Sequence, residues 1–180
     1  MTTVIIDIQN CKVYSDSRGT TSEEKFSIKS FGCVTEESYD DNIKKIFKVG
    51  NHVITGCGSL DLLTKIVNDC KKGNFHIPKR FYVKSKEDFN NTRIYICKKL
   101  DGKISGVKLY LTPKRIPLTG RIKVKVEKEV LEPECLYYTD GSGYQYASGA
   151  VQAKATPKEA INIAIKFDRY SGGDIQEEML

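Results

Sequence analysis

The chain has 180 residues and a formal net charge of +6, and a chain of this length can bury the core of one globular domain. Its 39% hydrophobic and 29% charged residues are ordinary values for a soluble globular protein. No apolar run approaches the roughly 18–20 residues that cross a bilayer, and residues 1–20 carry no signal-peptide pattern. We therefore expect neither a membrane-spanning nor a secreted protein.

The cysteines are scattered and form neither a Cys-x-x-Cys pair nor a His-rich neighbourhood: Cys11, Cys33, Cys57, Cys70, Cys97 and Cys135. Cysteines in this arrangement are more typical of reduced core residues than of disulfides or zinc ligands. The sequence thus predicts a cytoplasmic protein that holds no metal.

The N-terminal part reads as strands followed by a helix. The expected elements are strands at 4–8 and 12–15 about a Gln9-Asn10 turn, a polar segment at 22–41 compatible with an extended hairpin around Phe31-Gly32-Cys33, and strands at 44–49 and 52–55 across Gly50-Asn51. The apolar residues of 59–70 then repeat with the helical period, which predicts a helix that Gly73 stops.

The pattern is ambiguous from Pro78 onward and becomes regular again near residue 92. The expected elements are a short helix near 86–90, strands at 92–98 and 103–111 about Asp101-Gly102, a strand at 122–131, and helices at 144–155 and 157–167. The last helix opens with Thr156 as its cap, Pro157 in the first position and Glu159 three residues on, which is a capping box.

Early strands, one helix, more strands and late helices do not alternate as βαβ units. This order favours two packed antiparallel sheets with helices outside, an α+β sandwich. No internal repeat, linker or low-complexity segment divides the chain, so residues 1–180 are expected to form a single domain.

Positive charge is concentrated in one part of the chain. Residues 71–130 hold 17 Lys or Arg against 5 Asp or Glu, whereas the rest of the chain has a net charge of −6. In the segment 121–126 basic and aliphatic residues alternate, as in a strand with one wet, positive face. The segment reads either as a solvated face or as a surface for an acidic partner or nucleic acid. Nucleic acid is the weaker expectation, because no recognition motif is present and the tyrosines are too dispersed to form a stacking platform.

Thr2 and Thr3 directly follow Met1. If an aminopeptidase removes Met1, Thr2 carries both a hydroxyl and a free α-amine. A hydroxyl needs a nearby base to become a good nucleophile, and an α-amine with a pKa of roughly 7.7–8.0 can be that base. Taken alone, Met-Thr-Thr is an ordinary start, so the downstream motifs decide its meaning.

Four further motifs follow in order: Asp16-Ser17-Arg18, Lys44-Lys45, Gly141-Ser142-Gly143 and Asp168-Arg169-Tyr170-Ser171-Gly172-Gly173. With the two threonines, they make the chain resemble a proteasome β subunit, and most of all the bacterial HslV-type peptidases among the N-terminal nucleophile hydrolases. The resemblance is carried by two blocks at either end. It departs from the family at 20–41, which is longer, at 70–134, which does not match and includes the basic, strand-rich segment, and after Gly173, where the tail is short.

The resemblance implies a four-layer αββα sandwich and assigns a role to each motif. Thr2 would be the nucleophile, and Lys45 would be the cation that tunes it, paired with Asp16. Lys44 is expected to face solvent, and Arg18 to lie on the face of Asp16 if the strand continues. Judged alone, Asp16 and Lys45 also fit a plain surface ion pair.

The remaining roles follow the same resemblance. Gly58 would offer its N–H to the oxyanion, with Ser59 as the alternative register; Ser142 would lie near the amine; Asp168 and Ser171 would hold the N-terminal threonine. Each has a plainer reading: Gly58 as a strand-to-helix turn, Ser142 as a helix cap, and Asp168 with Ser171 as a helix end closed by Gly172-Gly173.

The implied function is a threonine peptidase that cleaves unfolded polypeptides without a metal or organic cofactor. The family also implies a homo-oligomeric ring and an ATPase unfoldase partner, and no membrane. The alternative is a non-catalytic proteasome-fold assembly or interaction module that uses the basic segment. A third reading is an amide hydrolase acting on small molecules.

Overall fold

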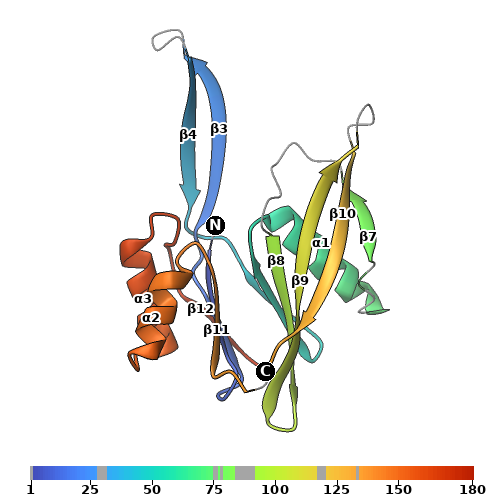
Figure 1. The fold of residues 1–180 in the computed structure, drawn as a ribbon, viewed down its shortest axis with the longest axis vertical. Helices are drawn as coiled ribbons and strands as arrows, with labels where there is room; N and C mark the ends of the chain where they lie inside the picture. Colours follow the sequence, from blue (N-terminus) through green and yellow to red (C-terminus); the bar gives the residue numbers. More distant parts are fainter. Residues whose placement is uncertain are drawn as a thin grey trace.

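Two antiparallel β-sheets, a separate hairpin and three α-helices make up the part of the chain that the structure describes (Figure 1). This computed structural model describes residues 2–27, 32–74, 77, 79–83, 92–116, 121–132 and 134–180. The helices are α1 (Leu60–Asp69), α2 (Tyr144–Gln152) and α3 (Pro157–Phe167). The predicted mixture of antiparallel sheets and helices is therefore confirmed.

The smaller sheet has the strand order β11-β1-β2-β12. Its strands are β1 (Thr3–Asp7), β2 (Lys12–Ser15), β11 (Tyr137–Gly141) and β12 (Gln176–Met179). β1 pairs with β11 from Thr3 opposite Gly141, and with β2 from Val4 opposite Ser15. β1, one of the two central strands of this sheet, thus begins at Thr3, directly after Thr2.

The larger sheet has the order β5-β6-β8-β9-β10-β7. Its strands are β5 (Ile46–Val49), β6 (His52–Cys57), β7 (Arg80–Val83), β8 (Thr92–Leu100), β9 (Lys103–Arg115) and β10 (Ile122–Val130). The predicted turn at Gly50-Asn51 joins β5 to β6, with Val49 opposite His52. Lys44 and Lys45 lie before β5, so the strand predicted at 44–49 begins two residues later than expected.

Side-chain alternation along β1 directs apolar residues to two separate cores. Val4 and Ile6 pack against Val53 and Cys97 of the larger sheet, whereas Ile5 packs against residues of α2 and α3. A third core joins α1 to the opposite face of the larger sheet. Figure 1 accordingly shows α2 and α3 beside the smaller sheet and α1 beside the larger one.

The helix signals in the sequence are confirmed in detail. Ser59 caps α1 through a bond from the Leu62 N–H, and Thr156 with Glu159 forms the predicted capping box of α3. Gly73 does not stop the first helix, because a π-helical turn, η1 (Cys70–Asn74), continues it. The short helix predicted near 86–90 lies outside the described residues.

The hairpin of β3 (Gly19–Ser27) and β4 (Gly32–Asp40) projects from the rest of the chain (Figure 1). Its strands pair only with one another among the described residues. An extended hairpin was predicted here, but its turn was placed wrongly: Ser27 is opposite Gly32, so Gly32 and Cys33 belong to β4. Phe31, the first residue of the predicted turn, lies outside the described residues.

No helix of the described residues is both long and apolar enough to cross a membrane.

Candidate active site

Thr2 and Thr3 stand at the entry to β1, and both are buried, with 4% and 0% of their surface exposed. Successive strand residues point to opposite faces of a sheet. Thr3 therefore shares the face of Ile5, under α2 and α3, whereas Thr2 shares the face of Val4, between the two sheets. The Ser142 N–H donates to the Thr2 carbonyl at 2.8 Å and fixes this entry.

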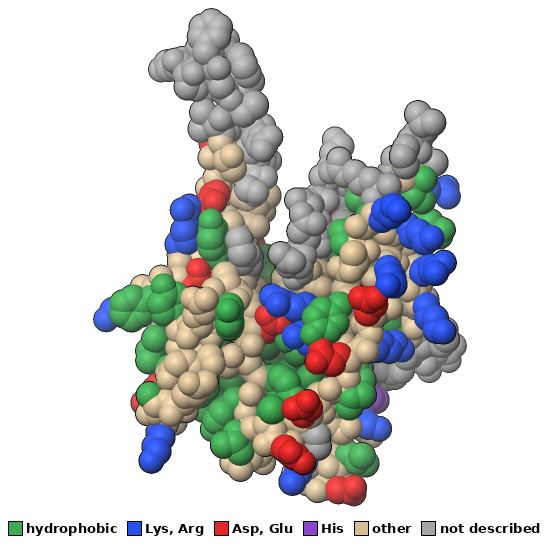
Figure 2. Space-filling model, viewed as in Figure 1, with side chains coloured by type: hydrophobic (Ala, Val, Ile, Leu, Met, Phe, Trp, Pro, Cys, Tyr) green, Lys and Arg blue, Asp and Glu red, His purple; other side chains and the backbone are tan. Residues whose placement is uncertain are grey.

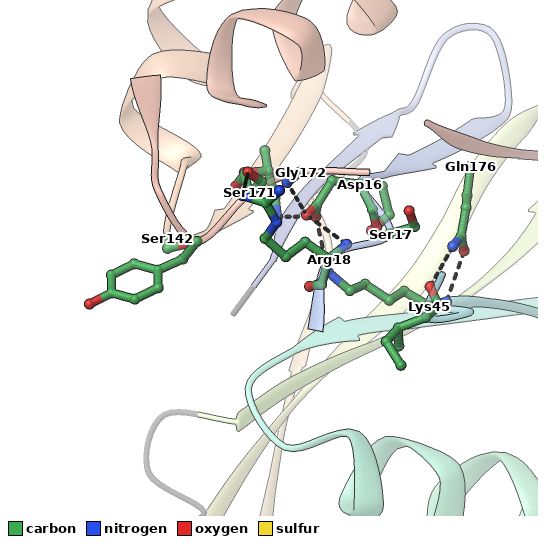
Figure 3. Close-up of polar contacts among 12 residues, drawn as sticks. Asp16, Ser17, Arg18, Lys45, Ser142, Ser171, Gly172 and Gln176 are labelled. Carbon is green, nitrogen blue, oxygen red and sulfur yellow. Dashed lines mark hydrogen bonds and ion pairs between the residues drawn. The ribbon is translucent and has the colours of Figure 1, made fainter. Parts of the chain in front are cut away.

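Asp16 is the centre of the first polar network, on the chain directly after β2 (Figure 3). Its carboxylate is fully buried. Oδ1 accepts from the Thr3 N–H at 2.7 Å and from Lys45 Nζ at 3.2 Å. Oδ2 accepts from the backbone N–H groups of Gly172 at 3.0 Å and Arg18 at 3.3 Å. Four donors thus converge on one fully buried carboxylate.

Lys45 reaches this carboxylate from the segment just before β5 of the larger sheet. Its side chain is 5% exposed, and Nζ also donates to the Arg18 carbonyl at 2.5 Å. Burial lowers the pKa of Lys45 below its ordinary 10.5, and the nearby Asp16 charge raises it only in part. The predicted pairing of Lys45 with Asp16 is therefore present, but it is a buried ion pair rather than a surface one.

Lys44 is exposed, as predicted, although the reason differs from the one expected. Alternation within a strand was the expected cause, but both lysines precede β5. The Gln176 side chain fixes this segment instead, because its Oε1 accepts from the backbone N–H groups of Lys45 at 2.8 Å and Ile46 at 3.3 Å (Figure 3). Gln176 begins β12, so the C-terminal strand positions the lysine.

The second polar network lies on the other side of β1. The Asp168 carboxylate accepts from the hydroxyls of Ser142 at 2.6 Å and Ser171 at 2.7 Å. The Ser171 Oγ is also 2.6 Å from Thr3 Oγ1. The predicted trio of Ser142, Asp168 and Ser171 is thus brought together, and the threonine side chain that it contacts is Thr3. The sequence analysis missed this role of Thr3, although the two adjacent threonines were a signal for it.

The two networks meet at the turn after α3. Ser171 belongs to the second network, and the N–H of the next residue, Gly172, donates to Asp16 in the first. Arg18 clamps the same turn: its guanidinium binds both oxygens of Asp41 and donates to the Ser171 carbonyl at 3.3 Å. A Cβ on Gly172 would lie 2.3 Å from Arg18 Cζ, so a side chain there would displace the Arg18 guanidinium from this turn. β2 ends at Ser15, so the strand does not continue through Asp16 to Arg18. The condition under which Arg18 was expected to share a strand face with Asp16 is therefore not met.

Gly58 is separate from both networks. It is exposed, has φ of +99°, and a Cβ there would lie 2.7 Å from the Thr92 Cα. None of the described residues accepts a hydrogen bond from its N–H. The neighbouring Ser59 N–H donates to Thr92 Oγ1 at 3.0 Å. Of the two candidate oxyanion donors, Gly58 is therefore the one whose N–H remains available.

A further charged cluster, which the sequence analysis missed, surrounds Asp140. Its carboxylate accepts from the Tyr95 hydroxyl and lies 2.8 Å from Arg93 Nη2 and 3.9 Å from Lys108 Nζ. Asp140 is opposite Val4 in the register, so it lies on the same sheet face as Thr2. This Asp140 cluster ties β11 of the smaller sheet to β8 and β9 of the larger one. Period-two alternation put Arg93 and Tyr95 on one face, but no sequence pattern paired them with Asp140.

Cys57 lies beside the same cluster and is 6% exposed. Burial, and secondarily the Asp140 charge, raises the pKa of its thiol to about 11. The thiol is therefore neutral near pH 7 and is a poor nucleophile. Among the described residues, no group of three or more His, Cys, Asp or Glu side chains gathers in an arrangement that could hold a metal ion.

No protein-family model matches the sequence, and no curated protein matches it. The chain is similar in fold to the solved structure of Thiobacillus denitrificans BPH in complex with epoxomicin. The TM-score is 0.53 and the identity is 19%, and the match covers 99% of this chain and 98% of that chain. This likeness includes the segment 70–134, where the sequence did not resemble the family. The likeness shows that the chain shares the overall fold of that protein.

Proposed function

We propose that this protein is a threonine-type endopeptidase subunit of the proteasome and HslV kind, with Thr2 as the nucleophile once Met1 is removed. One observation carries the proposal: a single atom, Asp16 Oδ1, binds both Lys45 Nζ and the N–H of the peptide that follows Thr2. The buried ammonium is thereby held one hydrogen-bond acceptor away from the backbone of the proposed nucleophile. A surface ion pair has no need for such an arrangement.

In the proposed reaction, Thr2 Oγ attacks the carbonyl carbon of the scissile peptide bond, and the α-amine of Thr2 accepts the hydroxyl proton. Lys45 remains protonated and supplies positive charge beside the amine. A neighbouring cation disfavours protonation of the amine and so keeps it competent as a base. The same charge stabilises negative charge on Oγ, an effect that is stronger because Lys45 is buried.

The N–H of Gly58, an exposed residue, is the proposed donor to the oxyanion that develops on the substrate carbonyl oxygen. The amine then returns its proton to the leaving nitrogen, which releases the first product and leaves an acyl ester on Thr2. A water molecule, deprotonated by the same amine, hydrolyses that ester and restores the hydroxyl.

Ser142, Asp168 and Ser171 are proposed as positioning residues. Ser142 holds the Thr2 carbonyl through its N–H and binds Asp168 through its hydroxyl, so the backbone and the carboxylate are coupled through one residue. Ser171 extends this coupling to Thr3. Together these bonds restrain the backbone on both sides of the Thr2–Thr3 peptide.

The fold supports the rest of the proposal at a coarser level. Three separate cores, one under α2 and α3, one between the sheets and one under α1, are what a four-layer αββα sandwich requires. We further propose a single domain in a cytoplasmic homo-oligomeric ring that degrades unfolded polypeptides fed by an ATPase unfoldase. The similar Thiobacillus denitrificans BPH binds epoxomicin, and we propose that this chain does so too.

Intact-mass analysis of purified protein, combined with epoxomicin binding, tests the proposal. We expect a mass that begins at Thr2, and an epoxomicin-dependent rise in melting temperature that Thr2→Ala abolishes. Thr64→Ala is the matched control, because it removes an exposed threonine hydroxyl on α1, outside both polar networks. Quantitative retention of Met1 in protein that binds epoxomicin normally would contradict the mechanism.

The second candidate function is a non-catalytic assembly or interaction module. The exposed basic strands β7, β9 and β10 favour it, because they lie outside both polar networks. This second candidate function predicts that the mature protein hydrolyses no peptide, regardless of the residue at position 2.

A further inference from the structure

At its β9-β10-β7 end, the larger sheet is exposed and strongly basic on the face that, farther along the sheet, packs against the smaller sheet. Along β10, Val124 and Val126 are buried under α1, whereas Lys123 and Lys125 alternate with them and lie on the other face. The register adds residues of β9 and β7 to this side, because Lys123 is opposite Lys114 and Lys125 is opposite Arg80. We call the set Arg80, Lys114, Lys123 and Lys125 the cationic face.

Two of these cross-strand pairs place like charges directly opposite one another. Lys114 faces Lys123, and Lys125 faces Arg80. Such pairs destabilise a sheet unless an anion lies over them. The carboxylates that share this part of the face are Glu127, which pairs with Lys125, and Glu129, so four cations stand against two anions. Figure 2 shows Lys and Arg side chains gathered over the region of β9, β10 and β7, and a surface of this kind fits an acidic partner.

The β3–β4 hairpin has the opposite charge and lacks a sheet to join. Residues 19–40 contain five Asp or Glu and two Lys. The two strands pair only with each other among the described residues, and an isolated two-stranded hairpin is marginally stable in water. Figure 1 shows that the hairpin stands well away from the cationic face of its own chain.

The two faces of β4 have different surroundings. Glu37 and Tyr39 alternate onto the side of Arg169, to which Glu37 is bonded and Tyr39 accepts a bond at 3.3 Å. Glu36 and Asp40 alternate onto the opposite side and are exposed. The hairpin therefore turns one acidic face inward, to its own chain, and one outward.

We propose that the outward face of the β3–β4 hairpin docks on the cationic face of a second copy of this chain. The chain supplies both complementary surfaces, and they lie on different parts of the molecule. The contact is therefore heterologous: the hairpin of one copy binds the larger sheet of the next copy. Repeated contacts of this kind build a closed ring when the rotation from one copy to the next adds up to a full turn. The proposal is independent of the peptidase activity.

Charge reversal tests the contact. Lys114→Glu with Lys125→Glu inverts the cationic face, and Glu36→Lys with Asp40→Lys inverts the outward face of the hairpin. Lys98→Glu with Lys99→Glu is the matched control, because both lysines are exposed and lie off the cationic face with the same change in charge. Sedimentation velocity over a concentration series measures association, and thermal melting checks that each variant is folded.

The wild type should associate, and the association should weaken steeply from 0.1 to 1 M salt as the Debye length falls from about 10 to about 3 Å. Either double reversal should weaken association by roughly tenfold or more, and the control should not. A mixture of the face variant and the hairpin variant should associate again, because each then offers the complement of the other. Thr2→Ala protein should behave as the wild type, which separates this contact from the proposed catalysis.

A second measurement does not depend on altered side chains. A zero-length carbodiimide reagent joins carboxylates to amines only where they touch. In a mixture of light and heavy-isotope wild-type chains, mass spectrometry should find mixed-isotope peptides that link 36–40 to 114–125. A monomer at all concentrations, or mixed links only elsewhere, would overturn the proposal. So would salt-sensitive binding of a single-stranded oligonucleotide that the face variant alone loses, since the cationic face would then be a nucleic-acid surface.

Discussion

Replacement of Lys45 by methionine separates the structural role of the buried ion pair from its chemical role. Methionine keeps most of the side-chain volume but removes the ammonium. Asp16, which is fully buried, then holds an unpaired negative charge. Loss of one partner from a buried ion pair costs about 3–5 kcal/mol of folding free energy. Because Asp16 keeps three backbone N–H donors, from Thr3, Arg18 and Gly172, we expect the lower value, about 3 kcal/mol.

For a chain of this length, 1 kcal/mol corresponds to about 2–4 °C in melting temperature, so Lys45→Met should melt about 6–12 °C below the wild type. Asp16→Asn combined with Lys45→Met removes both charges. The double variant should therefore be less destabilised than the sum of the single variants, by about 2 kcal/mol. Both single variants and the double variant should lack peptidase activity, because the cation beside Thr2 is lost or displaced in each.

Thermal and urea unfolding, with hydrolysis of short fluorogenic peptides at temperatures where every variant is folded, provide the measurements. The pH dependence gives an independent check. The folded pKa of Lys45 lies below 10.5, so between that value and 10.5 the unfolded chain binds more protons. Wild-type stability should consequently rise with pH in this window relative to Lys45→Met. Equal melting temperatures for wild type and Lys45→Met, or full activity of Lys45→Met, would refute the reasoning.

Three further predictions concern the surroundings of the site. Gly141→Ala should abolish activity and lower the melting temperature. Residue 141 has φ of +100°, and the new Cβ would lie 1.6 Å from the Thr2 carbonyl oxygen. Gly149→Ala is the control: no atom lies within 4 Å of its Cβ position, so this variant should be neutral or stabilising in the same melting assay. Asp140→Ala should cost about 3 kcal/mol in urea unfolding because it leaves the Tyr95 hydroxyl and Arg93 without their carboxylate, and a cost below about 1 kcal/mol would show that the Asp140 cluster does not join the sheets. Iodoacetamide at pH 7.5 should leave Cys57 unmodified in folded protein, because its thiol pKa is about 11, while the less buried Cys135 reacts; rapid labelling of Cys57, located by peptide mapping, would contradict this.

Local signals in the sequence predicted those element boundaries that are fixed by a helix cap or a turn motif. The capping box at Thr156 and Glu159 placed the start of α3, and Gly50-Asn51 placed the turn between β5 and β6. In each case the residues that fix the boundary are neighbours in the chain, so their pattern is visible in the sequence. Gly73 failed as a helix stop because a π-helical turn can pass through a glycine.

Five members of the two polar networks and the pairing of Lys45 with Asp16 were predicted, but the other bonds of the networks were not. Resemblance to the family indicated Asp16, Lys45, Ser142, Asp168 and Ser171, and the structure brings these residues together around β1. That Thr3, and not Thr2, contacts Ser171 depends on which face of β1 each threonine occupies. That face is set by packing between sheets and helices, which a short motif does not encode.

Long-range partners carried no sequence signal of their own. Gln176 holds the backbone of Lys45 from a strand at the far end of the chain, and Asp140 meets Tyr95 across two sheets. The cationic face was indicated by alternation in 121–126, yet its like-charge pairs emerge only from the register of β7, β9 and β10. Pairing between distant strands, rather than local propensity, decides all three features.

Peptide hydrolysis by wild type, Thr2→Ala and Thr2→Ser tests the central claim most directly. Thr2→Ala keeps the amine, Lys45 and the fold but removes the attacking oxygen, so its activity should fall to background while its melting temperature stays close to that of the wild type. Thr2→Ser keeps an oxygen nucleophile and should retain measurable turnover. Oligomer sizing of all three proteins ensures that a loss of assembly is not mistaken for a loss of chemistry. Equal rates for wild type and Thr2→Ala would contradict the assignment of Thr2 as the nucleophile.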